Sequence, residues 1–239
     1  MGELGHGYGS EWHLLRYLGR HRNTLNQKIE EETGGRVVDW LDFQFDRKSR
    51  FLDAEWKGMD FLTIGSTGAL KQEWAEFWPQ TGNVQNWDAV GWLAVGSKME
   101  LLLVEAKAHA EELKSPCGAK PHGGLDMICR AFESTISAFG LHAKVGDWLK
   151  PYYQYCNRLA ALHFLREKGV PARLIFIYFT GDHMEGRECP DSPSGWHDAL
   201  QRLYDHIEFP WSKQQDYGIH KVFLDVRGNP NVFDPHAGR

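Results

Sequence analysis

The stretch MELLLVEAKAHAEEL, residues 99–113, decides the fold of this chain. Four consecutive aliphatic residues at 101–104 favour a strand buried on both faces, whereas the segment from Glu105 onward is rich in helix formers. On a strand, Glu105 and Lys107 point to the same side of the sheet, but on a helix they diverge by about 200°. We expect a strand that continues through Lys107, with helix resuming after His109.

The preceding segment, NWDAVGWLAV at 86–95, predicts the partner strand of a hairpin. Gly96-Ser97 fits a two-residue turn of type II′, which prefers glycine at its first central position. Continued in the register of that turn, the two strands place Asp88 directly opposite Glu105. Directly opposed residues have Cβ atoms about 4.5–5.5 Å apart on one face of the sheet.

Asp88 and Glu105, side by side in an apolar sheet, repel each other unless a cation lies between them. A divalent metal ion is the natural counter-ion, and Lys107 can supply part of the positive charge. The acid-x-Lys pattern alone is weak, because further triplets of this kind occur at residues 46–48, 55–57 and 112–114. The predicted metal site therefore depends on the strand pairing.

The rest of the sequence alternates helices with buried strands, which indicates an α/β protein built as a three-layer α/β/α sandwich around a mixed sheet. The run ARLIFIYFTG is typical of a buried strand, since it is a continuous apolar segment bounded by turn signals. The expected helices span residues 11–32, 69–78, 125–141, 151–168 and 195–207. The expected strands outside the hairpin span residues 36–45, 58–64, 172–181 and 220–226.

The composition is that of a globular protein, with 42% hydrophobic and 25% charged residues in a chain of 239, a length that fits a single domain over residues 1–239. No apolar run approaches the roughly 18 residues of a membrane helix, and the glycine-rich N-terminus lacks a secretory signal core, so we expect a cytoplasmic protein. The net charge of −5 argues against nonspecific coating of nucleic acid, but not against an enzyme with a local basic groove. The spacings of the cysteines and histidines predict no zinc site.

An aspartate on one strand, followed by Glu-x-Lys at the end of the next, resembles the PD-(D/E)XK nuclease superfamily, which has the restriction-endonuclease-like fold. The residues that carry the resemblance are Asp88 in NWDAVG and Glu105 and Lys107 in LLLVEAKAH. Trp87 departs from the family pattern, in which proline precedes the aspartate. The family core is a helix, three antiparallel strands, a helix and a further strand. This chain can supply that order if residues around 46–85 are an insertion.

The resemblance implies that Asp88, Glu105 and the carbonyl group of Ala106 hold Mg²⁺ or Mn²⁺, which are hard cations that prefer oxygen ligands. It implies further that Lys107 orients or deprotonates the attacking water, while the metal stabilises charge on the scissile phosphate. The implied activity is hydrolysis of phosphodiester bonds, with DNA as the expected substrate. A homodimer would provide two active sites for paired cuts in duplex DNA.

Related nucleases often add a glutamate from a helix before the sheet and a polar residue from the helix after it. Glu73 and Glu11 are the candidates for the first role, and a solvated surface acid is the alternative in each case. Gln154 is the candidate for the second, with Asn157 and Arg158 at neighbouring positions on the same helix. A structural hydrogen-bond network is the alternative for these three residues.

Two further polar residues lie near the predicted site. Asn86 falls opposite Lys107 in the proposed register, and His109 either reaches a phosphate or caps an exposed turn.

Two other classes of protein stay open. A non-catalytic nucleic-acid- or protein-binding module that keeps the nuclease fold would fit the acidic net charge and the lack of an evident DNA-binding module. A metal-free α/β enzyme acting on a small molecule is less favoured, because no glycine-rich phosphate loop or nucleophile elbow occurs. A basic cleft centred on Asp88 would favour cleavage over binding without chemistry.

Overall fold

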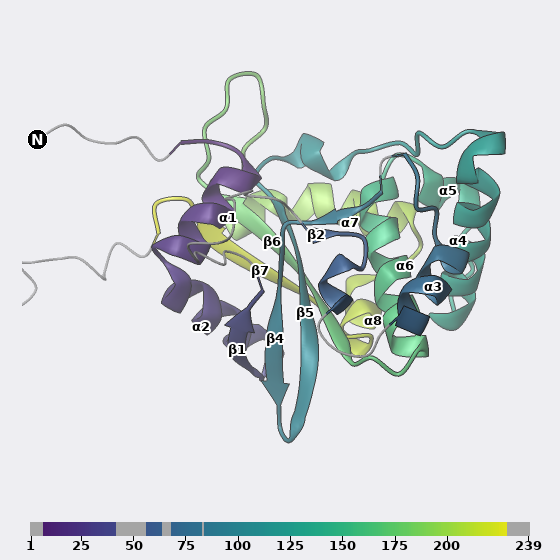
Figure 1. Ribbon diagram of the computed structural model, residues 1–239. Coiled ribbons are helices and arrows are strands. Elements are labelled where there is room, and N and C mark those ends of the chain that lie inside the picture. The colour runs from purple at the N-terminus through teal and green to yellow at the C-terminus, as the bar shows by residue number, and fades with distance from the viewer. Residues whose placement is uncertain (1–6, 42–55, 64–67, 83, 229–239) are drawn as a thin grey trace, which may run out of the picture.

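The computed structural model describes residues 7–41, 56–63, 68–82 and 84–228. In this part of the chain, a five-stranded mixed sheet lies between two layers of helices (Figure 1). Its strands, in spatial order, are β1 (Arg36–Trp40), β4 (Ala89–Val95), β5 (Lys98–Lys107), β6 (Ala172–Thr180) and β7 (Ile219–Asp225). The first three pair antiparallel, whereas β5, β6 and β7 run parallel to one another. The predicted α/β class with a mixed sheet is confirmed.

Strands β4 and β5 form the predicted hairpin. Their ladder runs from the turn at 96–97 to Ala89 opposite Val104, which is the register expected for a two-residue loop. Gly96 has a φ of 59°, as the first central position of a type II′ turn requires. The strand is confirmed through Lys107, and the helical alternative for this stretch is wrong.

The helix expected to resume after His109 is only a short 3₁₀-helix, η2 (Ala110–Leu113). The strong helix formers of this segment are overridden because Ser115 precedes a proline, which disfavours the helical conformation. Instead the N–H of Ser115 donates to the carbonyl of Pro151 at 2.5 Å, and Ser115 forms an isolated bridge with Tyr152. This pairing brings the start of the following long helix close to the end of β5.

One face of the sheet is covered by two helices, α1 (Ser10–Gly19) and α2 (Arg22–Thr33), where the sequence predicted one helix over 11–32. The break follows Gly19, a residue of low helix propensity. It lets α1 pack against β5 while α2 packs against β1 and β7, so that the two helices cover different parts of the same face. Four of the five apolar residues that follow a helical period in this segment are buried there, Leu14, Leu18, Leu25 and Ile29, whereas Leu15 is half-buried.

The opposite face carries the larger helical layer. Its members are α3 (Gly68–Phe77), α4 (Asp126–Ala138), α5 (Val145–Leu149), α6 (Tyr153–Glu167), α7 (His197–His206) and α8 (Trp211–Asp216). Two short helical turns, η3 (Pro121–Leu125) and η4 (Pro193–Trp196), precede α4 and α7. The four longer helices confirm the predicted ones to within a few residues at each end, whereas the short helices α5 and α8 were not predicted. Among the described residues, no helix combines the length and the apolar character needed to cross a membrane.

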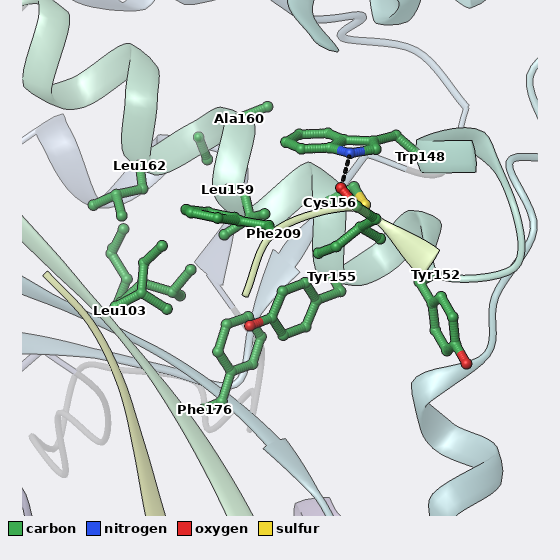
Figure 2. Packing of buried hydrophobic residues seen from close by; sticks show 14 of the residues in the cluster. Leu103, Trp148, Tyr152, Tyr155, Cys156, Leu159, Ala160, Leu162, Phe176 and Phe209 are labelled. Atoms are coloured by element: carbon green, nitrogen blue, oxygen red, sulfur yellow. Dashed lines mark hydrogen bonds between the residues drawn. The ribbon is translucent and has the colours of Figure 1, made fainter. Parts of the chain in front are cut away.

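Helix α6 is the centre of this layer, since it packs against β6 and all its residues from 155 to 165 are buried. Figure 2 shows the surrounding core. Tyr155 stacks on Phe176 of β6 with ring centroids 4.1 Å apart, and Trp148 donates its indole N–H to the carbonyl of Ile207 at 3.1 Å. Aromatic stacking and satisfied polar tips therefore hold α6 against the sheet.

The segment before β4 forms a small ribbon in which β2 (Trp56–Lys57) pairs antiparallel with β3 (Asn86–Trp87). The strand expected at 58–64 is wrong: the chain turns at Gly58, with a φ of 53°, into the 3₁₀-helix η1 (Asp60–Thr63). The strand expected at 36–45 is described only as far as β1 extends, because residues 42–55 lie outside the described part. Residues 46–55, 64–67 and 83 of the predicted insertion at 46–85 also lie outside the described part. The described residues of this segment contribute to the core beside α6.

Gly91 of β4 is a close-approach position between β4 and β1. A Cβ atom built there would lie 2.7 Å from the backbone oxygen of Asp39 and 3.1 Å from the Trp40 ring. We expect Gly91→Ala to lower the free energy of unfolding by about 1–3 kcal/mol, because the strands must separate to accommodate the methyl group. Chemical denaturation measures this. Gly118→Ala, where a Cβ meets no atom within 4 Å, is the matched control and should show no comparable loss.

A candidate active site at the end of the hairpin

Glu105 is the centre of a buried charge cluster at the end of β5. Its side chain is about 1% exposed, and each of its carboxylate oxygens faces a different cation. Oε1 lies 2.5 Å from Nζ of Lys107, two residues along the same strand. Oε2 lies 2.7 Å from both Nε and Nη2 of Arg158 on α6. Strand alternation explains the first contact, since residues two apart share one side of the sheet.

Asp88 joins this cluster from the start of β4. Its Oδ2 accepts the backbone N–H of Ala106 at 2.6 Å, which holds the carboxyl beside Glu105 on the neighbouring strand. The other oxygen, Oδ1, makes no hydrogen bond within the described part of the chain. The predicted convergence of Asp88 with Glu105 and Lys107 is therefore present, and the buried Ala106 lies between the latter two.

The predicted position of Asn86 opposite Lys107 is wrong. The β4–β5 ladder stops at Ala89, and the chain before it leaves the sheet to pair with β2. The side chain of Asn86 is exposed, but its backbone carbonyl accepts a hydrogen bond from Nη2 of Arg158. Asn86 therefore contributes a main-chain contact rather than the predicted side-chain group.

The two carboxyl groups of the cluster have pKa values shifted in opposite directions. Burial, together with repulsion from Glu105, raises the pKa of Asp88 from its ordinary value of 3.8 to about 8. Burial opposes ionisation of Glu105 as well, but the charges of Arg158 and Lys107 hold its pKa below the ordinary value. Glu105 is thus the ionised member, whereas for Asp88 burial and Glu105 outweigh the favourable effects of Lys107, the Ala106 N–H and Arg158.

Lys107 is an ammonium ion in this arrangement. Burial alone would lower its pKa, but the carboxylates of Glu105 and Asp88 raise the pKa of Lys107 above the ordinary value for a lysine. A group with a raised pKa donates hydrogen bonds and does not take up a proton from water. Of the two roles that the resemblance implies for Lys107, its raised pKa therefore favours orienting a water over deprotonating it.

Arg158 is a positioning residue, because all its contacts hold the cluster together. Its side chain is about 2% exposed, and Nη1 donates to Oδ1 of Asn157 at 2.8 Å. Its guanidinium carbon lies 4.9 Å from the centroid of the Trp87 ring, within the range of a cation–π interaction. The sequence marked Arg158 and Asn157 as polar neighbours on α6, but it did not predict that Arg158 neutralises Glu105 or that Trp87 supports Arg158.

A cavity of about 10 Å³ adjoins the cluster and is lined by Glu105, Lys107 and Gln154, together with apolar side chains. This volume corresponds to a single water molecule. Gln154 lies in the first turn of α6, and its backbone N–H donates to Oγ of Ser115 at 2.8 Å. Gln154 therefore lies beside Glu105 and Lys107, as the sequence predicted. The pairing of Ser115 with Tyr152 brings it there, because it holds the start of α6 near the end of β5.

Neither glutamate proposed from the preceding helices joins the cluster. Glu73 on α3 forms an ion pair with Lys168 at 2.5 Å, at the opposite end of α6 from Gln154. α3 is held at that end because Trp74 packs edge-on against Phe164, with ring centroids 5.0 Å apart. Glu11 is exposed at the start of α1. The surface-acid alternative holds for both glutamates.

His109 lies in a separate polar group beside the cluster. Its ring nitrogens lie 3.1 Å from Glu111 and 3.1 Å from Glu112, and Glu112 also accepts the N–H of Ala108 at 2.7 Å. The side chain of His109 makes no capping hydrogen bond to η2, so these contacts support neither of its two predicted roles. A buried pair formed by His13 and Asp182, 2.9 Å apart, anchors the start of α1 and was not predicted.

Comparison of the chain with models of known protein families, with curated proteins and with solved structures found no match. In the described residues, no group of three or more His, Cys, Asp and Glu side chains is arranged to hold a metal ion. The site is therefore defined by its own geometry: two carboxyl groups, one lysine and one arginine at the end of the hairpin.

The raised pKa of Asp88 predicts a pH dependence of stability. Since the folded state binds this proton more tightly than the unfolded chain, the stabilisation is fully present below pH 4 and is lost as the pH rises toward 8. From pH 5.5 to 8.5, with allowance for solvent screening, we expect wild type to lose about 2–3 kcal/mol relative to Asp88→Asn. Urea unfolding of both proteins across this range measures the difference. A constant difference would contradict the raised pKa.

Proposed function

We propose that this protein is a metal-dependent nuclease that hydrolyses phosphodiester bonds, with DNA as the expected substrate. The observation that carries the proposal is the convergence of Asp88, Glu105 and Lys107 at the end of the β4–β5 hairpin. Buried titratable groups with opposed pKa shifts are typical of catalytic sites. Gln154, at the adjoining cavity, supplies a polar group from α6 as related nucleases do.

The topology supports a restriction-endonuclease-like core. Helices α1 and α2 precede three antiparallel strands, β1, β4 and β5, and helix α6 leads to β6, which lies parallel to β5. This is the order of elements in the family that the sequence resembles. Asp88 directly precedes the second of these strands, and Glu105 and Lys107 end the third, in the order that the resemblance requires.

The donor chemistry fits a Mg²⁺ or Mn²⁺ ion. Asp88 and Glu105 would hold it, with the Ala106 carbonyl as the third oxygen implied by the resemblance. Two carboxylates suffice, because Mg²⁺ in proteins commonly keeps several waters and substrate phosphates as its other ligands. Oδ1 of Asp88 accepts no hydrogen bond within the described part of the chain, and burial is the main cause of its raised pKa, so a bound cation would offset the cost of ionising this carboxyl. When bound, such an ion stabilises the charge that develops on the scissile phosphate.

The chain's own residues perform three tasks in this proposal. Lys107 donates hydrogen bonds from its ammonium group and orients a water held beside Gln154 in the adjoining cavity. Arg158 fixes the rotamer of Glu105 through a hydrogen bond from Nε and an ion pair from Nη2, both to Oε2. The N–H of Ala106 fixes the carboxyl of Asp88, so that the reacting groups are arranged before substrate binds.

Binding of Mn²⁺, measured by calorimetry, tests the site. We expect wild type to bind the ion, and Asp88→Asn and Glu105→Gln each to weaken binding by at least about tenfold, since each removes a charged ligand. Glu73→Gln is the matched control, because it removes an exposed carboxylate that is paired with Lys168. Binding that neither site substitution affects would refute the metal site. Titrations in the presence of a thymidine dinucleotide cover the case in which the ion needs a phosphate ligand.

A non-catalytic binding module is the second candidate function. It is favoured by the neutralisation of both Glu105 oxygens and by an adjoining cavity that has room for only one water. A buried network whose charges are all paired, like that of Glu105 with Lys107 and Arg158, can stabilise a fold without taking part in catalysis. Such a module would bind DNA equally well in Mn²⁺ and in EDTA and would leave it uncut, whereas the nuclease would cleave it only in the presence of Mn²⁺.

A further inference from the structure

A second polar pocket lies beside the β2–β3 ribbon that leads into Asp88. Its volume is about 210 Å³, and its lining includes Lys57, Gly58, Lys71 and Trp74. The pocket is connected to the candidate active site through the ribbon. The N–H of Gly58 donates to Gln85 at 2.7 Å, and the carbonyl of Gly58 accepts the indole N–H of Trp87 at 2.9 Å.

The indole N–H of Trp74 is a buried donor with no acceptor in the described part of the chain. Trp74 is about 2% exposed, and buried polar groups are normally hydrogen-bonded. A Cβ atom built on Gly58 would lie 3.4 Å from this nitrogen and 3.4 Å from Cγ1 of Val84, which also lines the pocket. The absence of a side chain at Gly58 therefore leaves space in the pocket wall next to the unpaired N–H.

The charges around this space favour an anion. Among the described residues that line the pocket, two carry ammonium groups, Lys57 and Lys71, and one carries a carboxylate, Asp60. Nζ of Lys71 lies 3.2 Å from Oδ1 of Asp60, but their side chains are 35% and 61% exposed. An ion pair as open as this is weak and can exchange for a stronger anion. The pocket thus presents three donors from β2 and α3.

We propose that this pocket binds a phosphate group, with Lys57 and Lys71 contacting its outer oxygens and the Trp74 indole donating to an inner one. Phosphate has enough acceptor oxygens for all three donors, and lysine is a common phosphate ligand. The phosphate comes either from a nucleic-acid strand that continues from the candidate active site or from a free phosphomonoester. A nucleic-acid strand as the source rests on the proposed nuclease function. Phosphate binding by the pocket itself does not depend on that function.

The indole resonance of Trp74 provides the test. In ¹⁵N-tryptophan-labelled full-length protein, Trp74→Phe identifies this resonance among those of the ten tryptophans. Inorganic phosphate, titrated in EDTA at constant ionic strength, should move it downfield and saturably, because the N–H gains an acceptor. In the Lys57→Gln/Lys71→Gln variant, the midpoint concentration should rise about fivefold to thirtyfold. Lys28→Gln/Lys98→Gln, which removes two surface lysines away from the pocket lining, should leave the midpoint unchanged.

A Trp74 resonance that does not move with phosphate, or moves equally with chloride, would overturn the proposal. So would an unchanged midpoint in the Lys57→Gln/Lys71→Gln variant. Two further titrations separate the sources of the phosphate: an oligothymidylate without terminal phosphates and thymidine 5′-monophosphate. The ligand with the lower midpoint identifies the source. Because no metal is present and no cleavage is measured, this result is independent of the Mn²⁺ experiment.

Discussion

Replacing Arg158 by methionine is expected to lower the free energy of unfolding by about 3–5 kcal/mol. Arg158 neutralises Glu105 through a hydrogen bond from Nε and an ion pair from Nη2, and both side chains are almost fully buried. Methionine keeps much of the volume, but among the described residues it leaves the carboxylate with Lys107 alone as a direct cationic partner. The substitution also leaves the Asn86 carbonyl and Oδ1 of Asn157 without their donor. Equilibrium unfolding in urea measures the loss.

A double-mutant cycle separates the lost ion pair from the lost packing. In a Glu105→Gln background, Arg158→Met should cost much less than in wild type, because no buried carboxylate is left uncompensated. Arg130→Met on α4 is the matched control, since Arg130 is exposed, makes no hydrogen bond or ion pair within the described part of the chain, and is expected to change stability by less than about 0.5 kcal/mol. Equal costs of Arg158→Met in the two backgrounds would show that Arg158 acts through packing alone.

Replacing Lys107 by methionine is expected to lower the rate constant of Mn²⁺-dependent DNA cleavage by about 10²–10⁴-fold, the usual contribution of a group that positions a reacting water or proton. The Mn²⁺ affinity should stay equal to or above that of wild type. Lys107 competes for Oε1 of Glu105, and its removal frees that oxygen. Single-turnover cleavage at saturating Mn²⁺ measures the rate, and calorimetry measures the affinity.

Two controls accompany this experiment. Arg158 still neutralises Glu105 in the Lys107→Met variant, so the variant should fold, and its circular dichroism spectrum checks this. Lys168→Met removes a lysine that pairs with a glutamate on the surface, and it should cleave DNA like wild type. Unchanged cleavage by Lys107→Met, with wild type active, would remove Lys107 from the proposed mechanism. Cleavage absent from wild type in Mn²⁺ would favour the binding module.

The hairpin was predictable because its determinants are close together in the sequence. A glycine at the first turn position sets a two-residue loop, and the loop sets the register of both strands. The ladder follows that register to Ala89 and Val104, and the side of the sheet that carries Glu105 and Lys107 follows from alternation. The approach of Asp88 followed as well, although its side chain meets the Ala106 N–H from just outside the ladder.

The failed predictions share a different cause. Asn86 leaves the register because β3 pairs with β2, a partner that precedes it by about thirty residues. Glu73 lies far from the site because the aromatic packing of Trp74 on Phe164 directs α3 to the other end of α6. The predicted single helix is two helices because each must cover its own part of the sheet.

By itself, the sequence determined the class of fold, the hairpin register and the three side chains that the register brings together. Turn geometry, side-chain alternation and apolar runs act over a few residues, so they can be evaluated without knowing where distant segments lie. Only the tertiary structure decided that Arg158, 53 residues from Glu105, neutralises it, and that the unpaired Trp74 indole lies at a pocket of about 210 Å³. Such contacts depend on how separate elements pack in three dimensions, and no local pattern specifies that packing.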